Sequence, residues 1–332
     1  MPRISGGRAL VVRATLVGSV SSMVVWCMAL VPLEVRAQPA AATAEATAEV
    51  AEDAEAPPPA PAPAPAPYSV PFYLRPLPAV NVVRLDAVLA PHDRVASAAS
   101  PDASGLTLDT VQLVTVGVRV ADWLGLIARM GWDYTADPGE WGLSNLVLGG
   151  NFAARLDAGF RVSAFVAVSL PVGTDSNGQT VHRNARFARL AMDNAMFVVD
   201  HMAGIVGVGG AWVGEGWTVQ AEATLLAFGR VEGTGDEAIV NSTFGLLVGY
   251  FLLPEFSITG ELHHQHFLSD PVAVIATPEL RSQTSGTLGV RFHIQAMPGV
   301  WIRPGLSWSA GFDPPLSTDA WQMLQVDVPV LF

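Results

Sequence analysis

The last residues of the chain carry the pattern that most constrains its fold. Leu324, Val326, Val328, Val330 and Phe332 occupy every second position up to the carboxyl terminus. Successive side chains of a β-strand point to opposite faces, so these residues form one apolar face, and the positions between them are mostly polar. The pattern predicts a β-strand with one apolar side that ends the chain on an aromatic residue.

The same alternation recurs along the chain from Ala79 onward. Between residues 217 and 230, for example, Trp217 and Val219 alternate with Thr218 and Gln220. Turn-forming residues separate such segments. The sequence predicts twelve strands, at 79–90, 107–121, 124–134, 143–156, 160–171, 201–213, 217–230, 238–252, 256–268, 284–296, 300–310 and 321–332.

The connections between these predicted strands alternate in length. In chain order they measure 16, 2, 8, 3, 29, 3, 7, 3, 15, 3 and 10 residues. Bacterial membrane barrels have an even number of strands, with short turns at one end and longer loops at the other. A soluble Greek-key sandwich has no reason to keep this alternation.

Aromatic residues gather near both ends of the predicted strands, as they do at the two interfaces of a membrane. Those near short turns are Trp123, Trp212, Trp217, Phe256, Trp301 and Phe332, and those near long loops are Trp132, Tyr134, Trp141, Phe267, Trp308 and Trp321.

The closing strand resembles that of Gram-negative outer-membrane β-barrels, in which a terminal Phe and alternating apolar residues are read by the barrel-assembly machinery. The resemblance implies an all-β fold, with residues 79–332 forming a single closed antiparallel transmembrane β-barrel of about twelve strands. It further implies outer-membrane lipid around the barrel and both termini in the periplasm. Leu324, Val326, Val328, Val330 and Phe332 would then be the assembly signal.

The amino-terminal segment predicts an export signal. Three arginines precede an apolar run from Ala14 to Val31, and Val35-Arg36-Ala37 then offers a cleavage site. We therefore predict a signal peptide at residues 1–37, with a retained anchor helix as the alternative. Cys27, the one cysteine of the chain, falls in this segment, so the mature chain would have no disulfide.

Residues 38–78 form a predicted periplasmic tail rich in Ala and Pro. Its repetitive composition cannot bury a core, and the proline-rich half should be extended. The tail is either disordered or a tether to the cell wall or to a periplasmic partner. Its last part, Tyr68–Pro78, is aromatic, and we expect it to pack in or under the barrel mouth.

Composition excludes some classes of protein. Half of the residues are apolar and 14% are charged, yet no apolar run of 20 residues follows residue 40. The formal net charge of −12 argues against a nucleic-acid partner.

Charged residues share one parity of the predicted strands. An ionised group on the lipid face near the midplane costs about 2–4 kcal/mol, so this parity should face the lumen. They either line a pore for anionic or polar solutes or pair across a packed lumen, and a twelve-stranded barrel permits both. The predicted lumen residues are Arg84, Asp86, Arg119, Arg129, Asp133, Arg155, Arg161, Glu222, Arg230, Glu261, Arg291, Arg303 and Asp327.

Residues 143–176 carry a second resemblance. A strand with Asn145 and Gly149, a three-residue turn, and a strand that ends Leu-Pro-Val-Gly-Thr-Asp at residues 170–175 resemble the outer-membrane transporter-like family named after the meta-pathway of phenol degradation. The match covers about a tenth of the chain, and Gly142-Leu-Ser-Asn145 replaces the usual Gly-x-Gly-Asp opening. The resemblance implies passage of hydrophobic or aromatic compounds.

The sequence predicts no enzyme activity, cofactor or metal. In His263-His264-Gln265-His266, strand alternation puts at most two imidazoles on one face, whereas zinc takes three or four ligands. Ser269, Asp270 and His293 match no recognised hydrolase motif. The longest loop, residues 172–200, should either fold inward as a constriction or form a short helix over the mouth.

These observations predict passive passage of small solutes across the outer membrane. The alternative is a structural or interaction barrel with a closed lumen, whose Pro/Ala tail tethers a periplasmic partner or the cell wall.

Overall fold

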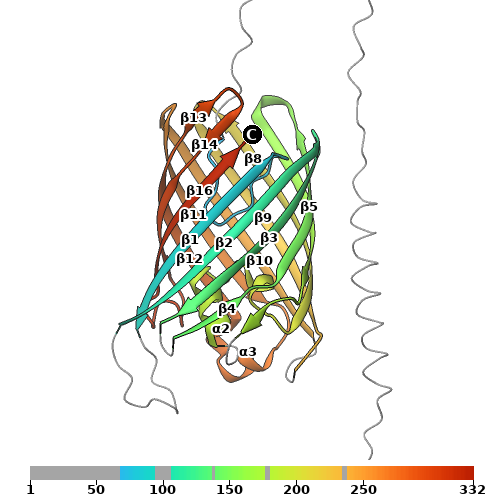
Figure 1. The fold of residues 1–332 in the computed structure, drawn as a ribbon, viewed down its shortest axis with the longest axis vertical. Coiled ribbons are helices and arrows are strands. Elements are labelled where there is room, and N and C mark those ends of the chain that lie inside the picture. Colours follow the sequence, from blue (N-terminus) through green and yellow to red (C-terminus); the bar gives the residue numbers. More distant parts are fainter. Residues whose placement is uncertain (1–67, 94–105, 137–138, 176–179, 234–237) are drawn as a thin grey trace, which may run out of the picture.

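The computed structural model describes residues 68–93, 106–136, 139–175, 180–233 and 238–332, so the predicted signal peptide and residues 38–67 of the tail lie outside them. Within these residues, twelve strands form one closed antiparallel barrel (Figure 1), which confirms the predicted fold. They are β1 (Val82–Asp93), β2 (Leu106–Ala121), β3 (Leu124–Thr135), β5 (Leu146–Arg155), β6 (Phe160–Leu170), β8 (His201–Gly214), β9 (Trp217–Arg230), β10 (Ala238–Leu253), β11 (Phe256–Phe267), β12 (Ser282–Phe292), β15 (Gly305–Gly311) and β16 (Gln322–Leu331).

The closing seam joins the two ends of the barrel sequence. β16 pairs antiparallel with β1, from Val82 opposite Leu331 to Leu89 opposite Leu324. Beyond this ladder, the Phe332 N–H donates to the Asn81 carbonyl at 3.2 Å. The final strand therefore pairs with the first, as the sequence predicts.

The predicted strand 143–156 is interrupted, and Ser144 and Asn145 separate β4 (Glu140–Leu143) from β5. The backbone N–H of Asn145 donates to the Met196 carbonyl at 2.7 Å, and its side-chain amide donates to the Val198 carbonyl at 2.9 Å. The break occurs because the chain here bonds to a segment inside the barrel instead of to its neighbouring strands.

The predicted strands 284–296 and 300–310 are also divided. His293 separates β12 from β13 (Ile294–Met297), and Arg303-Pro304 separates β14 (Val300–Ile302) from β15. Pro304 has no N–H to give to a ladder, which explains the second break.

The two ends of the barrel differ as the loop lengths predict. The end with short turns, called here the short-turn end, also holds the C-terminus and the β13–β14 hairpin (Figure 1). The opposite, long-loop end carries β4, α2 (Thr180–Ala188) and α3 (Val272–Ala276), together with β7 (Thr174–Asp175), which pairs with β4. Among the described residues, no helix is long and apolar enough to cross a membrane.

Side chains alternate between the two faces of the wall. On β9, Thr218, Gln220 and Glu222 are buried inside, whereas Trp217 and Val219 are exposed outside. Leu288 on β12 has 66% of its surface exposed on the exterior. The exterior is therefore apolar and the interior contains most of the buried polar groups.

One aromatic residue differs from the predicted pair of belts. Trp321 is 3% exposed, and its ring stacks inside the barrel on His92 with 3.7 Å between centroids. Phe187 of α2 packs edge-on against the same indole at 5.6 Å. Trp321 lies inside because it has the interior parity of β16 and supports α2.

Substitution of an exterior wall residue by arginine tests whether the wall contacts lipid. We expect Leu288→Arg to lower the free energy of unfolding in phospholipid vesicles by about 2–4 kcal/mol, because the charge would enter hydrocarbon. The control is Leu253→Arg at the short-turn end of β10, where an arginine costs about 0–1 kcal/mol. Urea unfolding followed by tryptophan fluorescence measures both, and equal losses would contradict a lipid-facing exterior.

Candidate functional site

Residues 68–78, called here the plug, lie inside the barrel. The plug enters the lumen from the short-turn end, reaches its deepest point near Tyr73 and returns to the wall before β1. The Leu77 N–H donates to the Tyr68 hydroxyl at 3.3 Å, which ties the two limbs together. Phe72, at 1% exposure, is one of the most deeply buried aromatic residues. The sequence predicts that this segment packs in or under the barrel mouth, and in the structure it packs inside the lumen.

Charged wall residues hold the tip of the plug by its main chain. Glu261 on β11 accepts the N–H of Phe72 at 2.5 Å and that of Tyr73 at 3.1 Å. Arg84 on β1 donates to the carbonyls of Pro71, at 2.7 Å, and Phe72. One carboxylate and one guanidinium therefore satisfy both kinds of main-chain group.

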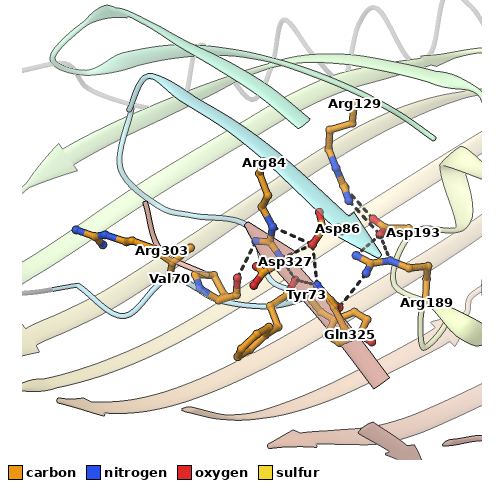
Figure 2. A network of polar contacts seen from close by, with 12 residues as sticks. Val70, Tyr73, Arg84, Asp86, Arg129, Arg189, Asp193, Arg303, Gln325 and Asp327 are labelled. Atoms are coloured by element: carbon orange, nitrogen blue, oxygen red, sulfur yellow. Dashed lines mark hydrogen bonds and ion pairs between the residues drawn. The ribbon is translucent and has the colours of Figure 1, made fainter. Parts of the chain in front are cut away.

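The same arginine belongs to a buried charge network (Figure 2). Its Nη2 lies 2.7 Å from Asp86 Oδ1 and 2.9 Å from Asp327 Oδ2. Arg291 contacts the same Asp327 oxygen at 2.8 Å and donates to the Val70 carbonyl at 3.2 Å. Because opposite charges are paired here, the interior tolerates several ionised groups.

The returning limb of the plug is fixed in the same way. Glu222 on β9 accepts the Arg75 N–H at 3.0 Å and lies 3.4 Å from the Arg75 guanidinium. Gln220 donates to the Arg75 carbonyl at 2.8 Å, and Asn151 donates to that of Leu77 at 2.9 Å.

Glycines in the wall leave room for plug side chains. A Cβ at Gly245 would lie 2.8 Å from Leu74 Cγ, and one at Gly305 would lie 2.7 Å from Phe72 Cε1. Such contacts are too short for a real Cβ, so a larger residue at either position would require Leu74 or Phe72 to shift.

A second segment fills the lumen from the long-loop end. Residues 180–200, called here the loop insert, contain α2 and a 3-10 turn at Asn194–Met196. Asp193 lies 2.8 Å from Arg129 on β3 and 2.9 Å from Arg189 within the insert. The sequence predicts that this loop either folds inward or forms a short helix. In the structure it does both.

Asp193 belongs to the connection outside the strands. Burial acts to raise its pKa, but the opposing charges of Arg129 and Arg189 hold the pKa of its carboxyl well below the ordinary range. Asp193 is therefore ionised wherever the barrel is folded at neutral pH.

The plug and the loop insert meet in the middle of the lumen. The Arg189 guanidinium lies over the Tyr73 ring at 4.5 Å and donates to Gln325 at 3.1 Å (Figure 2). Phe72 and Tyr73 share one apolar cluster with Met196 and Phe197 of the insert. The two segments and the wall therefore form a continuous buried core.

Little free space remains beside the plug. A cavity of about 70 Å³ lies between it and the wall, lined by Val82, Ile127 and Phe165 with Arg84 and Arg129. This is less than half of the roughly 150 Å³ of an apolar cavity that binds benzene. A solute of that size would need the plug to move.

Twelve of the thirteen predicted lumen residues have the interior parity of their strands, and Arg303 lies in the break between β14 and β15; as a pore lining all thirteen remain a prediction. Arg84, Asp86, Asp133, Glu222, Glu261, Arg291 and Asp327 are buried, Arg129, Arg161, Arg230 and Arg303 are partly buried, and Arg119 and Arg155 are exposed at the short-turn rim.

The histidines separate as strand alternation predicts. His263 is fully buried in the lumen, 3.3 Å from Glu261, whereas His264 and His266 lie on the exterior. Within the described residues, no three or more His, Cys, Asp and Glu side chains are placed to hold a metal ion.

Sequence reasoning missed the apolar half of the lumen. Towards the long-loop end, Val88, Leu113, Leu226 and Phe228 have the interior parity and pack in the buried cluster. One feature of the sequence could have predicted it. These strands become apolar on both faces near the long-loop end, which indicates that another segment packs against their inner face.

Phe72→Ala tests how firmly the plug is held. We expect it to speed maleimide labelling of a reporter thiol at Ser69→Cys at least tenfold, in a chain with Cys27→Ala. Removing a buried Phe side chain costs about 3–5 kcal/mol of packing, which favours withdrawal of the plug. The control Phe160→Ala, on the exterior of the barrel, should leave the labelling rate unchanged. Equal labelling rates for the Ser69→Cys chain alone, with Phe72→Ala and with Phe160→Ala would contradict the role of Phe72 in holding the plug.

Asp193→Asn should destabilise the barrel by about 3–5 kcal/mol at pH 7, because two buried arginines lose their carboxylate. The folded pKa of Asp193 lies below its usual value of 3.8, so its contribution is present above that pH and is lost as pH falls through the folded pKa. The difference between wild type and variant should therefore shrink below about pH 4. Urea unfolding at pH 7 and pH 3 measures it, and a difference independent of pH would contradict the ion pairs.

Comparisons with known proteins support the fold. No protein-family model matches the chain, and no curated protein matches its sequence. Among solved structures, the barrel is similar to an outer-membrane channel from Pseudomonas putida F1, with 13% identity and a TM-score of 0.50 over 80% of this chain and 100% of that one. It also matches the NanC porin, with 10% identity and a TM-score of 0.46 over 75% of this chain and 98% of that one. The chain thus has the fold of an outer-membrane β-barrel.

Proposed function

We propose that the protein is an outer-membrane channel for passive passage of small solutes and that the structure describes its closed state. The closed barrel, its apolar exterior and its similarity in fold to the Pseudomonas putida channel support this proposal. The observation that carries it is that two inserted segments, the plug and the loop insert, occupy the lumen and meet there in one buried cluster.

The plug is the better candidate for the moving part. Glu261, Arg84 and Glu222 hold its main chain and Arg75 through hydrogen bonds and ion pairs, which water can replace, so their net contribution to stability is small. Both segments also bury apolar side chains, which water does not replace. Phe72 and Tyr73 of the plug pack in the buried cluster, whereas the loop insert contributes a longer run that includes Leu190 and Met196.

The two halves of the wall favour a class of solute. The long-loop half buries apolar wall residues such as Leu226 and Phe228 beside polar ones such as Asp133, and the short-turn half holds the arginines Arg84 and Arg291. This arrangement supports, as solutes, small aromatic or apolar compounds that carry an ionised group. It joins the two solute classes suggested by the sequence.

A specific observation favours the alternative, a structural or interaction barrel. Phe72 and Tyr73 of the plug share one apolar cluster with the insert and the wall, and a permanently closed barrel would look the same. In that case the predicted tail would serve a periplasmic partner or the cell wall.

A cross-linked plug separates these functions. Ser69 Oγ and Thr259 Oγ1 lie 2.9 Å apart, so cysteines at both positions can form a disulfide. In a chain with Cys27→Ala and Phe72→Ala, we expect planar-bilayer conductance above that of wild type. Adding Ser69→Cys and Thr259→Cys should abolish the increase under oxidising conditions, and reductant should restore it.

Ser69→Cys without the second cysteine is the matched control and should conduct in both conditions. If the chain with Phe72→Ala and a chain with residues 68–77 replaced by Gly-Ser repeats are both silent, the channel proposal fails in favour of the structural barrel.

A further inference from the structure

We infer that the short-turn half of the lumen is a binding site for a peptide that folds back on itself, which the protein's own plug occupies as an intramolecular ligand. The inference rests on the proposed function only in treating the plug as removable. The ligand class follows from which atoms of the plug the wall contacts.

The wall contacts the main chain of the plug along its length. On β9, Thr218 accepts the Ser69 N–H at 3.0 Å, and Gln220 and Glu222 bind the carbonyl and N–H of Arg75. The same kind of contact recurs at Glu261 for two consecutive N–H groups. Every residue has these main-chain atoms, so the contacts specify the folded-back path of a peptide and its register more than its composition.

Closure of the barrel explains why side chains of the wall, and not its main chain, bind the main chain of the plug. Proteins that bind extended peptides often add the peptide to a free sheet edge through main-chain hydrogen bonds. The pairing of β1 with β16 closes the twelve-stranded wall and leaves it without such an edge. Polar side chains of the wall provide the donors and acceptors instead.

Glycines supply the selectivity for side chains. Gly305 faces Phe72, Gly245 faces Leu74, and a Cβ at Gly209 would lie 2.7 Å from Leu77 Cδ2. Glu222 pairs with Arg75. The site therefore fits an aromatic residue, an aliphatic residue two positions later, an arginine directly after it and a second aliphatic residue.

The buried charges favour an occupied site. Glu261 is 5% exposed and its two oxygens accept plug N–H groups. Without a peptide, this carboxylate would lose both donors while it remains inside the barrel, which is costly for a buried charge. A free peptide with the same spacing restores both hydrogen bonds.

Binding in trans tests the inference. The protein is the full chain with residues 68–77 replaced by Gly-Ser repeats, and the probe is a fluorescein-labelled peptide with the sequence of residues 68–78. Fluorescence anisotropy should show saturable binding to this chain and at least a hundredfold weaker binding to wild type, whose site is occupied. Circular dichroism verifies folding, and if the replacement chain does not fold, Phe72→Ala with Tyr73→Ala takes its place.

A peptide methylated on the nitrogens of Phe72 and Tyr73 is the matched control. It keeps every side chain and loses both donors to Glu261, so binding should weaken at least tenfold. In a barrel that also carries Glu261→Gln, the penalty for methylation should shrink, as a double-mutant cycle requires. Equal binding of both peptides, or no binding to a folded barrel, would overturn the inference. Peptide binding without conductance in any chain would instead contradict only the channel proposal.

Discussion

Closure of the sheet by the pairing of β16 with β1 is the constraint on which the other features depend. In hydrocarbon, an unpaired N–H or C=O group has no water to bond, so a sheet can reside there only without edges. The ladder from Val82–Leu331 to Leu89–Leu324 supplies the last row of partners. Closure in turn divides every strand into an outer and an inner set of side chains. Whatever occupies the inside must be held by inner side chains or by its own folding.

The interior charges satisfy this condition by sharing carboxylates between arginines. Asp327 lies between Arg84 and Arg291, and Asp193 lies between Arg129 and Arg189. Glu261 has a different partner, because its nearest donors are the N–H groups of the plug. The plug is therefore part of the electrostatic balance of the lumen as well as a steric obstacle. The charges that the sequence suggests for solute selection are engaged with the protein itself in this structure.

Much of the barrel could be predicted because strand alternation and loop length are local properties. The parity of Glu222 against Trp217, for instance, follows from counting positions. The interruption at Asn145 could not be predicted, because it depends on a carbonyl of Met196, 51 positions along the chain. The same holds for the plug, since nothing within residues 68–78 indicates that Glu261 will accept its N–H groups. Long-range contacts inside a closed wall leave little trace in a single sequence.

The two inserted segments differ in a way that gives the lumen a direction of opening. The loop insert is continuous with the wall at both ends through β7 and β8, and its apolar side chains form much of the buried cluster. Within the described residues, the plug is continuous with the wall through β1, and its other limb, at Tyr68, lies towards the short-turn end with polar partners such as Gln220 and Arg303. Withdrawal through that end breaks hydrogen bonds that water can remake and removes Phe72 and Tyr73 from the buried cluster, while the apolar side chains of the insert stay packed on the wall. Movement of the insert would expose apolar surface and separate Asp193 from two arginines. We therefore infer that opening begins at the short-turn end, with the loop insert as the fixed constriction.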